Sequence, residues 1–416
     1  LKAWFTFKLV LIYRLITGLL ALIFLVLFSQ ILEKYYFKNQ SSSEVLLIFS
    51  FTIIFIVIIA IISSLFQGFQ NLKLFSAIIF TEKFFFLIAM LTLIFLEFKQ
   101  NALLPAYALL FGTIFTSIVF FPFLFKFKKY FHKGPLDKIK VVKKIFSFGI
   151  ASFMISLGNI IIGYIDTIII TIYRPLSEVG IYNVILPTVI IIGFLSRSIS
   201  QVFFPMVSEL NAKKLYSKLN QGLSLLHNYS LLIVIPLAVT MFVFPEFIIQ
   251  LLFGQEYITG SLTMQILSVG VIFFTLGTID QSVISGIGKP KIVTQILLLA
   301  SVFNVIANIL LIPIFGMNAA ALTTTISYFI IMKLTLNSLK NNLNFQITSI
   351  TWIKFIILSI ILTGFMYLIK YLIFNPYLGF IIAFVVGILI YFILATFLNL
   401  FNLKEFISIF NGLIKK

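Results

Sequence analysis

The 416-residue sequence contains no cysteine and only two histidines. Without cysteine the chain can form no disulfide and has no thiolate to act as a nucleophile or metal ligand. His132 and His227 are far apart in the sequence, and neither belongs to an HExxH or comparable metal-binding pattern. A glycine-rich phosphate loop of the GxxxxGK type is also absent. We therefore expect no metal, no cofactor and no hydrolysis of ATP by this chain.

Charge is scarce as well. Only 10% of the residues are charged, whereas 61% are hydrophobic, and the mean hydropathy is +1.17. A soluble domain cannot bury that much apolar surface, so the composition indicates a membrane protein. The net charge of +18 would suit a nucleic-acid-binding surface, but the basic residues lie in short segments between apolar runs. That arrangement is typical of topology signals, and no nucleic-acid partner is expected.

Twelve apolar segments are long enough to cross a bilayer, which takes about 20 residues. They lie at about residues 9–32, 44–67, 74–97, 102–125, 145–173, 180–207, 225–251, 261–287, 292–312, 317–339, 351–374 and 378–402. The predicted fold class is therefore an all-α polytopic membrane protein.

Most of the 30 lysines and arginines fall in alternate connections between these segments. With the N-terminus inside, the inner segments hold Lys2, Lys8, Lys73, the basic stretch 126–144, Lys213, Lys214, Lys218, Lys289, Lys291, Lys333, Lys340, Lys354, Lys404, Lys415 and Lys416. The outer loops hold only Lys34, Lys38, Lys99, Arg174 and Lys370. Positive charge is enriched on the cytoplasmic side of membrane proteins, so both ends of this chain are predicted to be cytoplasmic.

A charge at the bilayer centre costs on the order of 2.5–3.5 kcal/mol, and six charged residues of the predicted spans are not explained by a position near the interface, as Glu246 is. They are Arg14, Glu82, Lys83, Asp166, Arg197 and Asp280. Arg14 lies about one turn inside its span, so it either extends to the headgroups or faces a cavity. Arg197 is deeper and lies among serines, which favours a cavity.

Glu82 and Lys83 are adjacent and point to different faces of a helix, so we do not expect them simply to neutralise each other. Either their helix begins later than residue 74, which we favour, or one of them faces a polar cavity. For Asp166 a salt bridge and a coupling or gating role are both open. For Asp280 a hydrogen bond that packs helices together is favoured. An arginine fork binds adjacent phosphate oxygens well, so an anionic lipid headgroup is a sensible cargo for such a set.

Five short passages, taken in order, resemble the Wzx-like polysaccharide flippases of the multidrug/oligosaccharidyl-lipid/polysaccharide exporter superfamily. They are Asp166 followed by VGIY at 179–182, FPMVS at 204–208, LFGQEY at 252–257, GIGKPK at 286–291, and NVIAN at 304–308 with IPIFG at 312–316 and AAAL at 319–322. The likeness is good over residues 140–345. The Asp166 passage comes about two helices earlier than in that family, and the sequence opens on Leu1 rather than Met. We therefore expect that two further helices precede it.

The resemblance implies two helical lobes around a central cavity, with an extra helix pair at the C-terminus. The predicted parts are an N-terminal lobe at 1–128, a basic cytoplasmic linker at 129–144, a C-terminal lobe at 145–341, the helix pair at 350–402 and a tail at 403–416.

The implied function is transfer of a polyprenyl-pyrophosphate-linked oligosaccharide, such as an O-antigen repeat unit, across the bacterial cytoplasmic membrane by alternating access. The predicted substrate-binding residues are Arg14, Arg197 and Lys83. The predicted coupling or gating residues are Asp166, Glu82 and Asp280. Membrane lipids, a polysaccharide polymerase and assembly proteins are the implied partners.

Three other functions stay open at this stage. An ion-coupled multidrug or metabolite exporter of the same superfamily is the first. A membrane polymerase or glycosyltransferase is disfavoured, because every predicted outer loop is short and such enzymes generally carry a large one. A scaffold in a polysaccharide-assembly complex is the third.

Overall fold

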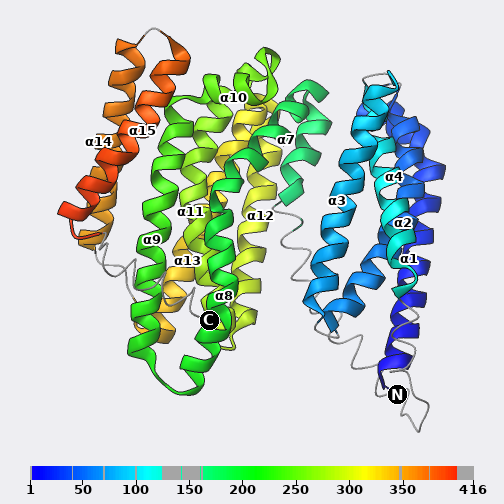
Figure 1. Cartoon of the computed structure of the whole chain (residues 1–416), viewed down its shortest axis with the longest axis horizontal. Helices are drawn as coiled ribbons and strands as arrows, with labels where there is room; N and C mark the ends of the chain where they lie inside the picture. The colour runs from blue at the N-terminus through cyan, green and yellow to red at the C-terminus, as the bar shows by residue number, and fades with distance from the viewer. Residues whose placement is uncertain are drawn as a thin grey trace. The chain divides into compact units, whose positions relative to one another are not determined.

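The computed structural model describes residues 2–39, 41–68, 71–98, 101–123, 142, 160, 163–345, 349–373 and 375–400 (Figure 1). Helices dominate these residues, and none of them forms a strand. The chain divides into two compact units, Leu1–Ser152 and Phe153–Lys416, which are described here one at a time.

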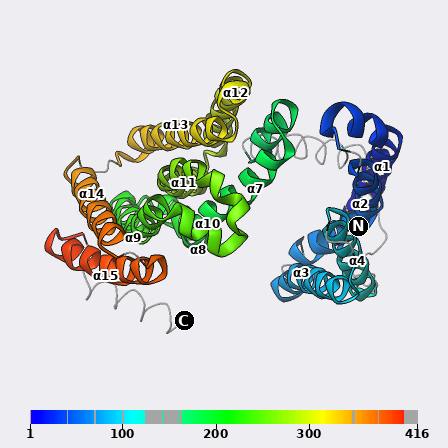
Figure 2. The same cartoon turned by 90° about the horizontal axis from the view of Figure 1, so that it is seen from above.

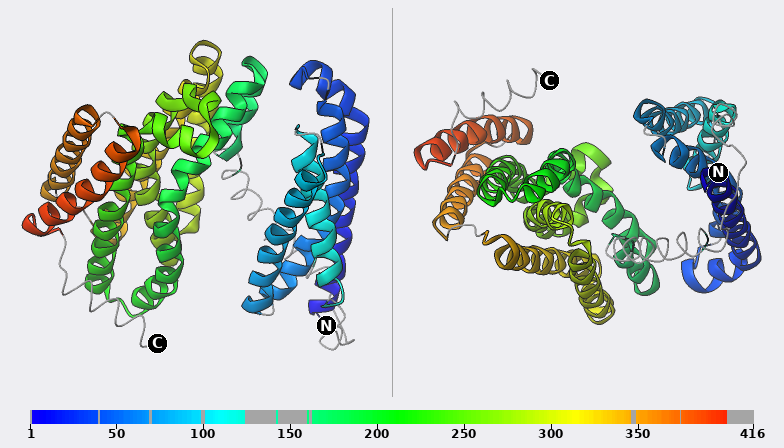
Figure 3. Two further views of the ribbon diagram at one scale, coloured as in Figure 1. Left: turned by 45° about the horizontal axis from the view of Figure 1, so that its top comes forward. Right: turned by 90° about the horizontal axis from the view of Figure 1, so that it is seen from below.

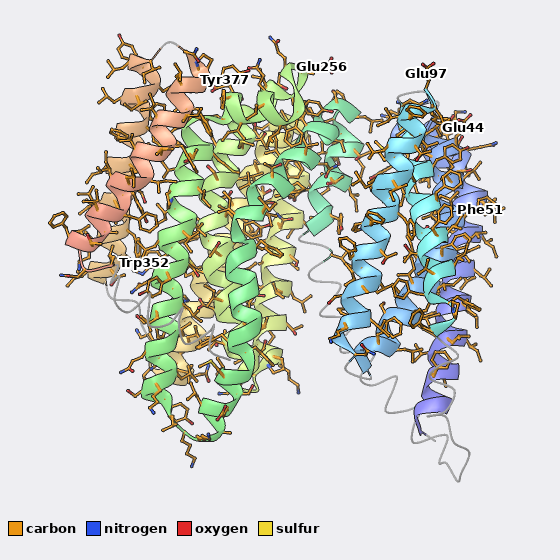
Figure 4. All side chains as sticks on the ribbon, viewed as in Figure 1. Glu44, Phe51, Glu97, Glu256, Trp352 and Tyr377 are labelled. Atoms are coloured by element: carbon orange, nitrogen blue, oxygen red, sulfur yellow. The ribbon has the colours of Figure 1, made fainter. Side chains whose placement is uncertain are left out.

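The described residues of the N-terminal unit form four long helices. They are α1 (Lys2–Leu32), which ends in a π-helical turn (Glu33–Phe37), α2 (Ser42–Gly68), α3 (Leu72–Phe95) and α4 (Leu103–Phe120). Helix α1 packs on α2, and both α2 and α3 pack on α4 (Figure 2). The centre is apolar and includes Ile62, Phe66 and Ile78, while side chains such as Phe51 cover the outside (Figure 4).

The C-terminal unit begins, within the described residues, with an apolar helix over Gly163–Tyr173. It continues through α7 (Leu176–Ile190), a 3-10 turn (Ile191–Gly193), α8 (Phe194–Ala212), α9 (Tyr216–Val243), α10 (Pro245–Phe253), a second 3-10 stretch (Gln255–Gly260), α11 (Ser261–Gly286), α12 (Pro290–Phe315), α13 (Met317–Leu343), α14 (Ser349–Leu372) and α15 (Pro376–Phe397).

Helix α11 is the centre of this unit and packs against α13, α9, α8 and α7 (Figure 2). Glycine permits a close approach to α13, because a Cβ atom at Gly270 would lie 2.6 Å from the Thr325 hydroxyl. In lipid, where the hydrophobic effect does not drive helices together, such close contacts supply much of the packing energy.

Helices α14 and α15 form a pair that packs on α9 (Figure 3). Buried apolar side chains make up the contact, among them Leu358, Leu362 and Met366 of α14 and Ala383 of α15. Lys370 adds polar contacts at one end, where its Nζ donates to the carbonyl of Val243 at 2.9 Å.

The predicted all-α polytopic fold is confirmed. Eleven helices of the described residues are long and apolar enough to cross a membrane. The predicted span at 145–173 lies largely outside the described residues, and its described end is the shorter helix Gly163–Tyr173. The basic linker at 129–144 lies outside them apart from residue 142, so the predicted lobe boundaries there stay predictions.

Three predicted boundaries are wrong. The span expected at 180–207 is divided by the 3-10 turn Ile191–Gly193 between α7 and α8. The span expected at 225–251 is two helices, because α9 ends at Val243 and Pro245 begins α10, where its missing N–H is not needed. The helix expected to begin after residue 74 begins at Leu72, so Glu82 and Lys83 lie well inside it.

Candidate functional site

The Asp166 carboxylate is buried in the C-terminal unit, with only 1% of the residue exposed. It accepts hydrogen bonds from Tyr182 of α7, Asn308 of α12 and Thr324 of α13, each at 2.5 Å. One carboxylate therefore joins the Gly163–Tyr173 helix to three others. Each bond replaces one that water would otherwise provide, which is what a polar group in a membrane interior requires.

A second layer of polar groups fixes the donors to Asp166. The Asn308 amide also donates to the Asn304 carbonyl oxygen at 3.0 Å, one turn earlier on α12. The Thr323 hydroxyl donates to Asn308, and Asn304 donates to the Thr324 hydroxyl at 3.4 Å. Asn304, Asn308, Thr323 and Thr324 are all fully buried. The result is a closed network in which α12 and α13 cannot slide past each other without breaking several bonds.

Asp280 of α11 forms a second buried cluster. One carboxylate oxygen lies 2.7 Å from Nε2 of His227 on α9, and the other accepts from the Thr335 hydroxyl of α13 at 3.1 Å. The favoured helix-packing hydrogen bonds at Asp280 are therefore present. The imidazole ring of His227 also meets the Phe345 ring edge-on, with the ring centres 5.4 Å apart.

A hollow of about 580 Å³ lies beside the Asp166 network, lined by the Gly163–Tyr173 helix, α7, α11, α12 and α13. Its polar lining consists of amides and hydroxyls: Tyr164, Asn183, Thr278, Gln281 and Tyr328. No charged side chain is among the described residues that line it. The volume is within the range of small-molecule sites, which is roughly 300–1,000 Å³.

The network and the hollow share the same helices. Gly163 lines the hollow three residues before Asp166, and Asn183 follows Tyr182. Thr324 and Tyr328 are one turn apart on α13, so one helix face serves both. The buried network thus holds in place the walls of the hollow.

Aromatic and amide groups define what the hollow can bind. Phe274 and Tyr328 stack at a tilt with ring centres 5.0 Å apart, and the Asn183 carbonyl oxygen accepts from Thr167 at 2.8 Å. Gln281 makes no hydrogen bond with its amide among the described residues, so this group is available to a ligand. Rings that offer apolar faces beside amide donors and acceptors suit an uncharged, hydroxyl-rich molecule.

The remaining predicted site residues have different surroundings. Arg14 on α1 is half-buried, and its Nη1 atom is buried without a hydrogen-bond partner among the described residues. Glu82 and Lys83 on α3 form an ion pair of 2.9 Å, so the expectation that they would not neutralise each other is wrong. The two side chains are long and flexible enough to bring their charged groups together although their Cβ atoms point to different faces of α3. Arg197 lies on α8, and its side chain is outside the described set.

A polar contact also explains the glycine of the IPIFG passage. Glu178 of α7 pairs with Arg174 at 2.9 Å and accepts from the backbone N–H of Met317 at 3.1 Å. A Cβ atom at Gly316 would lie 2.3 Å from the Glu178 carboxylate and would displace it, and the φ of 60° at this position favours glycine on its own. Sequence reasoning missed this clamp because Glu178 and Gly316 belong to distant passages.

Together, these features define a polytopic helical membrane protein with a buried polar core in its C-terminal unit. A sequence profile of the family described as polysaccharide biosynthesis protein matches residues 5–262. The chain belongs to that family.

Relatives with known names come from archaea and bacteria. The chain is 33% identical to an uncharacterized membrane protein, MJ1068, of Methanocaldococcus jannaschii, over 94% of this chain and 80% of that one. It is 26% identical to the probable low-salt glycan biosynthesis flippase Agl15 of Haloferax volcanii, over 61% of this chain and 54% of that one. CapF, a capsular polysaccharide biosynthesis protein of Staphylococcus aureus, is 29% identical over 47% of this chain and 49% of its own.

Solved structures with the same fold include the lipid II flippase MurJ in an inward closed conformation. That structure has a TM-score of 0.80 at 20% sequence identity and covers 95% of this chain and 83% of its own. An inward-facing multidrug-resistance transporter of the MATE family has a TM-score of 0.62 at 14% identity, covering 80% of this chain and 79% of its own. At these identities the likeness establishes the fold.

Proposed function

We propose that this protein is a flippase that moves a polyprenyl-pyrophosphate-linked oligosaccharide from the inner to the outer leaflet of the cytoplasmic membrane. It works by alternating access and forms or breaks no covalent bond in the cargo. Membership of the polysaccharide biosynthesis family and the relationship to a probable glycan flippase support this proposal.

The observation that carries it is the uncharged hollow of the C-terminal unit. A sugar offers hydroxyl groups for hydrogen bonds and C–H faces for aromatic contact, and this lining provides amides, hydroxyls and rings. A charged lining would instead favour an ionic cargo. We propose that Asn183, Gln281, Tyr164 and Tyr328 contact the sugars of the cargo.

The pyrophosphate requires cations, and we propose Arg14 and Arg197 for that role, with Lys83 as a further contributor. The unpartnered, buried Nη1 of Arg14 supports its part in this set, because a buried guanidinium N–H without a partner costs free energy until an acceptor arrives. Lys83 is already paired with Glu82, so its contribution requires that this pair opens.

We propose Asp166 as the gate, with Asp280 and Glu82 as secondary coupling residues. Four helices meet at the Asp166 carboxylate, so any motion that separates them must break its hydrogen bonds. Such a cluster has two discrete arrangements, bonded and broken, which is the kind of element that a conformational switch needs.

An ion-coupled exporter is the second candidate. The observation that favours it is the pair of fully buried carboxylates, Asp166 and Asp280, in one unit. Such an exporter would carry amphipathic cations and would leave a lipid-linked sugar in its original leaflet.

The decisive experiment measures translocation of a fluorescent polyprenyl-pyrophosphate oligosaccharide in liposomes that contain the purified protein. Wild type should move the lipid between leaflets. Gln281→Leu should slow transport about tenfold, since the loss of one hydrogen bond of ~1.4 kcal/mol gives that factor. Gln250→Leu on α10, an exposed position away from the hollow, is the matched control and should transport normally.

Variants of the arginines extend the test. Arg14→Ala and Arg197→Ala should each reduce transport of the pyrophosphate-linked cargo. Full activity in either variant would remove that residue from the proposed set. Absence of wild-type movement, alongside proton- or sodium-driven efflux of an organic cation, would replace the flippase proposal by the exporter.

A further inference from the structure

A second hollow of the C-terminal unit, about 470 Å³, lies between α13 and the start of α14. Lys333, Asn337 and Lys340 line it at intervals of four and three residues, which places all three on one face of α13. All three are exposed. Trp352 of α14 lines the opposite side.

The two ammonium groups of this hollow are uncompensated. Neither Lys333 nor Lys340 has a hydrogen-bond or ion-pair partner among the described residues, and no carboxylate lines the hollow. Some other lysines of the same unit are occupied: Lys213 pairs with Glu209, Lys289 with Asn342, and Lys354 with the carbonyl of Leu398. Lys218 and Lys291 also lack a partner among the described residues, but they do not line the hollow, where Lys333 and Lys340 occur together. Lys333 and Lys340, with the Asn337 amide between them on α13, therefore form a site that could bind an anion.

The hollow lies at the end of the unit where lysines collect. Figure 4 shows Trp352 near the first turn of α14, at the end of this helix that faces away from the labelled Tyr377 of α15 and Glu256 of the second 3-10 stretch. The turns after α8 and after α11, which carry Lys213 and Lys289, lie at the same end of the unit as the C-terminal end of α13 (Figure 1). Tryptophan and lysine at a helix end mark the headgroup level of a bilayer.

The rest of the lining is apolar. Leu334, Leu336 and Phe345 complete the wall. The hollow therefore combines two ammonium groups, which can bind an anion, with an apolar surface that can contact hydrocarbon. A free phosphate ion would use only the cations. A phospholipid would use both.

We propose that this hollow binds the headgroup of an anionic phospholipid. Its phosphate would lie between Lys333 and Lys340, with Asn337 as a hydrogen-bond donor and the acyl chains along Leu334 and Leu336. Basic pockets between transmembrane helices on the cytoplasmic side are a known form of lipid-headgroup site. The proposal does not depend on the transported cargo.

This site is separate from the hollow assigned to the sugars. Tyr328 and Ile331 of α13 line that hollow, whereas Lys333 is five residues beyond Tyr328. At 3.6 residues per turn this spacing rotates the side chain by about 140° around the helix axis. The two sites thus use different faces of α13.

The test measures retention of lipid by the purified full chain with native mass spectrometry, using phosphatidylglycerol and phosphatidylcholine at equal concentration. Wild type should retain phosphatidylglycerol preferentially. The double variant Lys333→Gln/Lys340→Gln should weaken this binding by about twenty-five-fold, because each lysine near an anionic lipid contributes roughly a fivefold affinity. The control, Lys218→Gln/Lys291→Gln, loses the same charge at the same end and should bind as wild type does.

A local readout comes from Trp352. In a Trp4→Phe background it is the sole tryptophan, since the chain has two. Phosphatidylglycerol with brominated acyl chains should quench its fluorescence, and the Lys333/Lys340 double variant should abolish that quenching. The thermal midpoint of each variant confirms that it is folded.

Three outcomes would overturn the proposal. Equal losses in the two double variants would mean that the attraction is a diffuse charge effect. Equal retention of phosphatidylcholine would mean that the hollow takes any lipid. Displacement of the lipid by millimolar inorganic phosphate would make it a phosphate site. None of these outcomes bears on the flippase assay.

Discussion

The two units of this protein bury different kinds of polar group. In the described part of the N-terminal unit the buried polar side chains are hydroxyls: Ser29, Ser50, Thr52, Thr113, Thr116 and Ser117. Five of them donate to a carbonyl three or four residues earlier in the same helix, and only Ser117 reaches another helix, at 3.4 Å. The C-terminal unit buries carboxylates, amides and an imidazole that bond across helices up to 158 residues apart.

These two kinds of buried hydrogen bond constrain the positions of neighbouring helices differently. A hydroxyl bonded to its own helix satisfies itself wherever that helix moves, so it places no constraint on a neighbour. A carboxylate shared by four helices fixes their register, because each displaced donor would be left unsatisfied in lipid. The N-terminal unit is held by shape, as at Gly112, where a Cβ atom would lie 2.8 Å from the backbone nitrogen of Phe86. We infer that the C-terminal unit is the more rigid of the two.

Asp166→Ala is the substitution expected to destabilise the C-terminal unit most. It leaves the donors of Tyr182, Asn308 and Thr324 without their acceptor, which should lower the free energy of unfolding by about 3–5 kcal/mol, because each buried unsatisfied donor costs about 1–3 kcal/mol. Unfolding in detergent micelles, followed by circular dichroism, measures the change.

The matched control is Thr113→Val in the N-terminal unit. Its hydroxyl bonds only within α4, so the change should be under about 1 kcal/mol, close to the value for an isosteric swap without a cross-helix bond. Similar losses in the two variants would contradict the distinction between the units.

Asp280→Leu tests the second cluster, with an expected loss of about 2–3 kcal/mol, because the buried ring of His227 loses its partner. Changing both partners, in Asp280→Leu/His227→Leu, should restore part of that loss, since no polar group is then left alone. A double-mutant cycle on the unfolding free energies gives the coupling. Additive single effects would mean that the two side chains do not stabilise each other.

Gly316→Ala tests a backbone contact of the C-terminal unit, at the turn between α12 and α13. Gly316 has φ 60° and ψ −141°, a conformation almost confined to glycine, and its added Cβ would collide with Glu178. We expect a loss of about 2 kcal/mol from the backbone strain alone. Gly180→Ala is the control, because its Cβ would meet nothing within 4 Å and should stabilise helix α7 by about 0.5–1 kcal/mol. The two thermal midpoints should therefore shift in opposite directions.

The sequence predicted the fold class well, because hydropathy and span length are summed over about 20 residues and survive local errors. It predicted helix ends less well. Pro236 lies inside α9, while Pro245 begins a new helix, and nothing in the local sequence separates the two cases. At Glu82 and Lys83 the face rule failed because flexible side chains can pair despite adjacent backbone positions.

The candidate site was predictable only in part. A carboxylate in an apolar run pointed to Asp166 and Asp280, but not to their partners. Asn304 and Asn308, four residues apart within an apolar helix, were a usable signal for a buried polar face. Thr324 and Thr335 gave no such signal, because threonine is common in membrane helices and usually bonds to its own backbone. Which helix lies beside which is a tertiary fact that spacing along one chain does not contain.

The smallest predicted effect concerns the terminal helix pair, which resembles the N-terminal unit in relying on apolar contact. Lys370 of α14 pairs with Glu246 at 3.2 Å, yet both side chains are well exposed, at 39% and 52%. Exposed pairs contribute about 0–1 kcal/mol, so Lys370→Met should change the unfolding free energy by roughly 0.5 kcal/mol and leave the pair docked. Glu246→Gln should have an equally small effect. Hydrogen exchange of α14 and α15 checks the docking: rapid exchange in Lys370→Met alone would show that its bond to the Val243 carbonyl, rather than the apolar contact, attaches this pair.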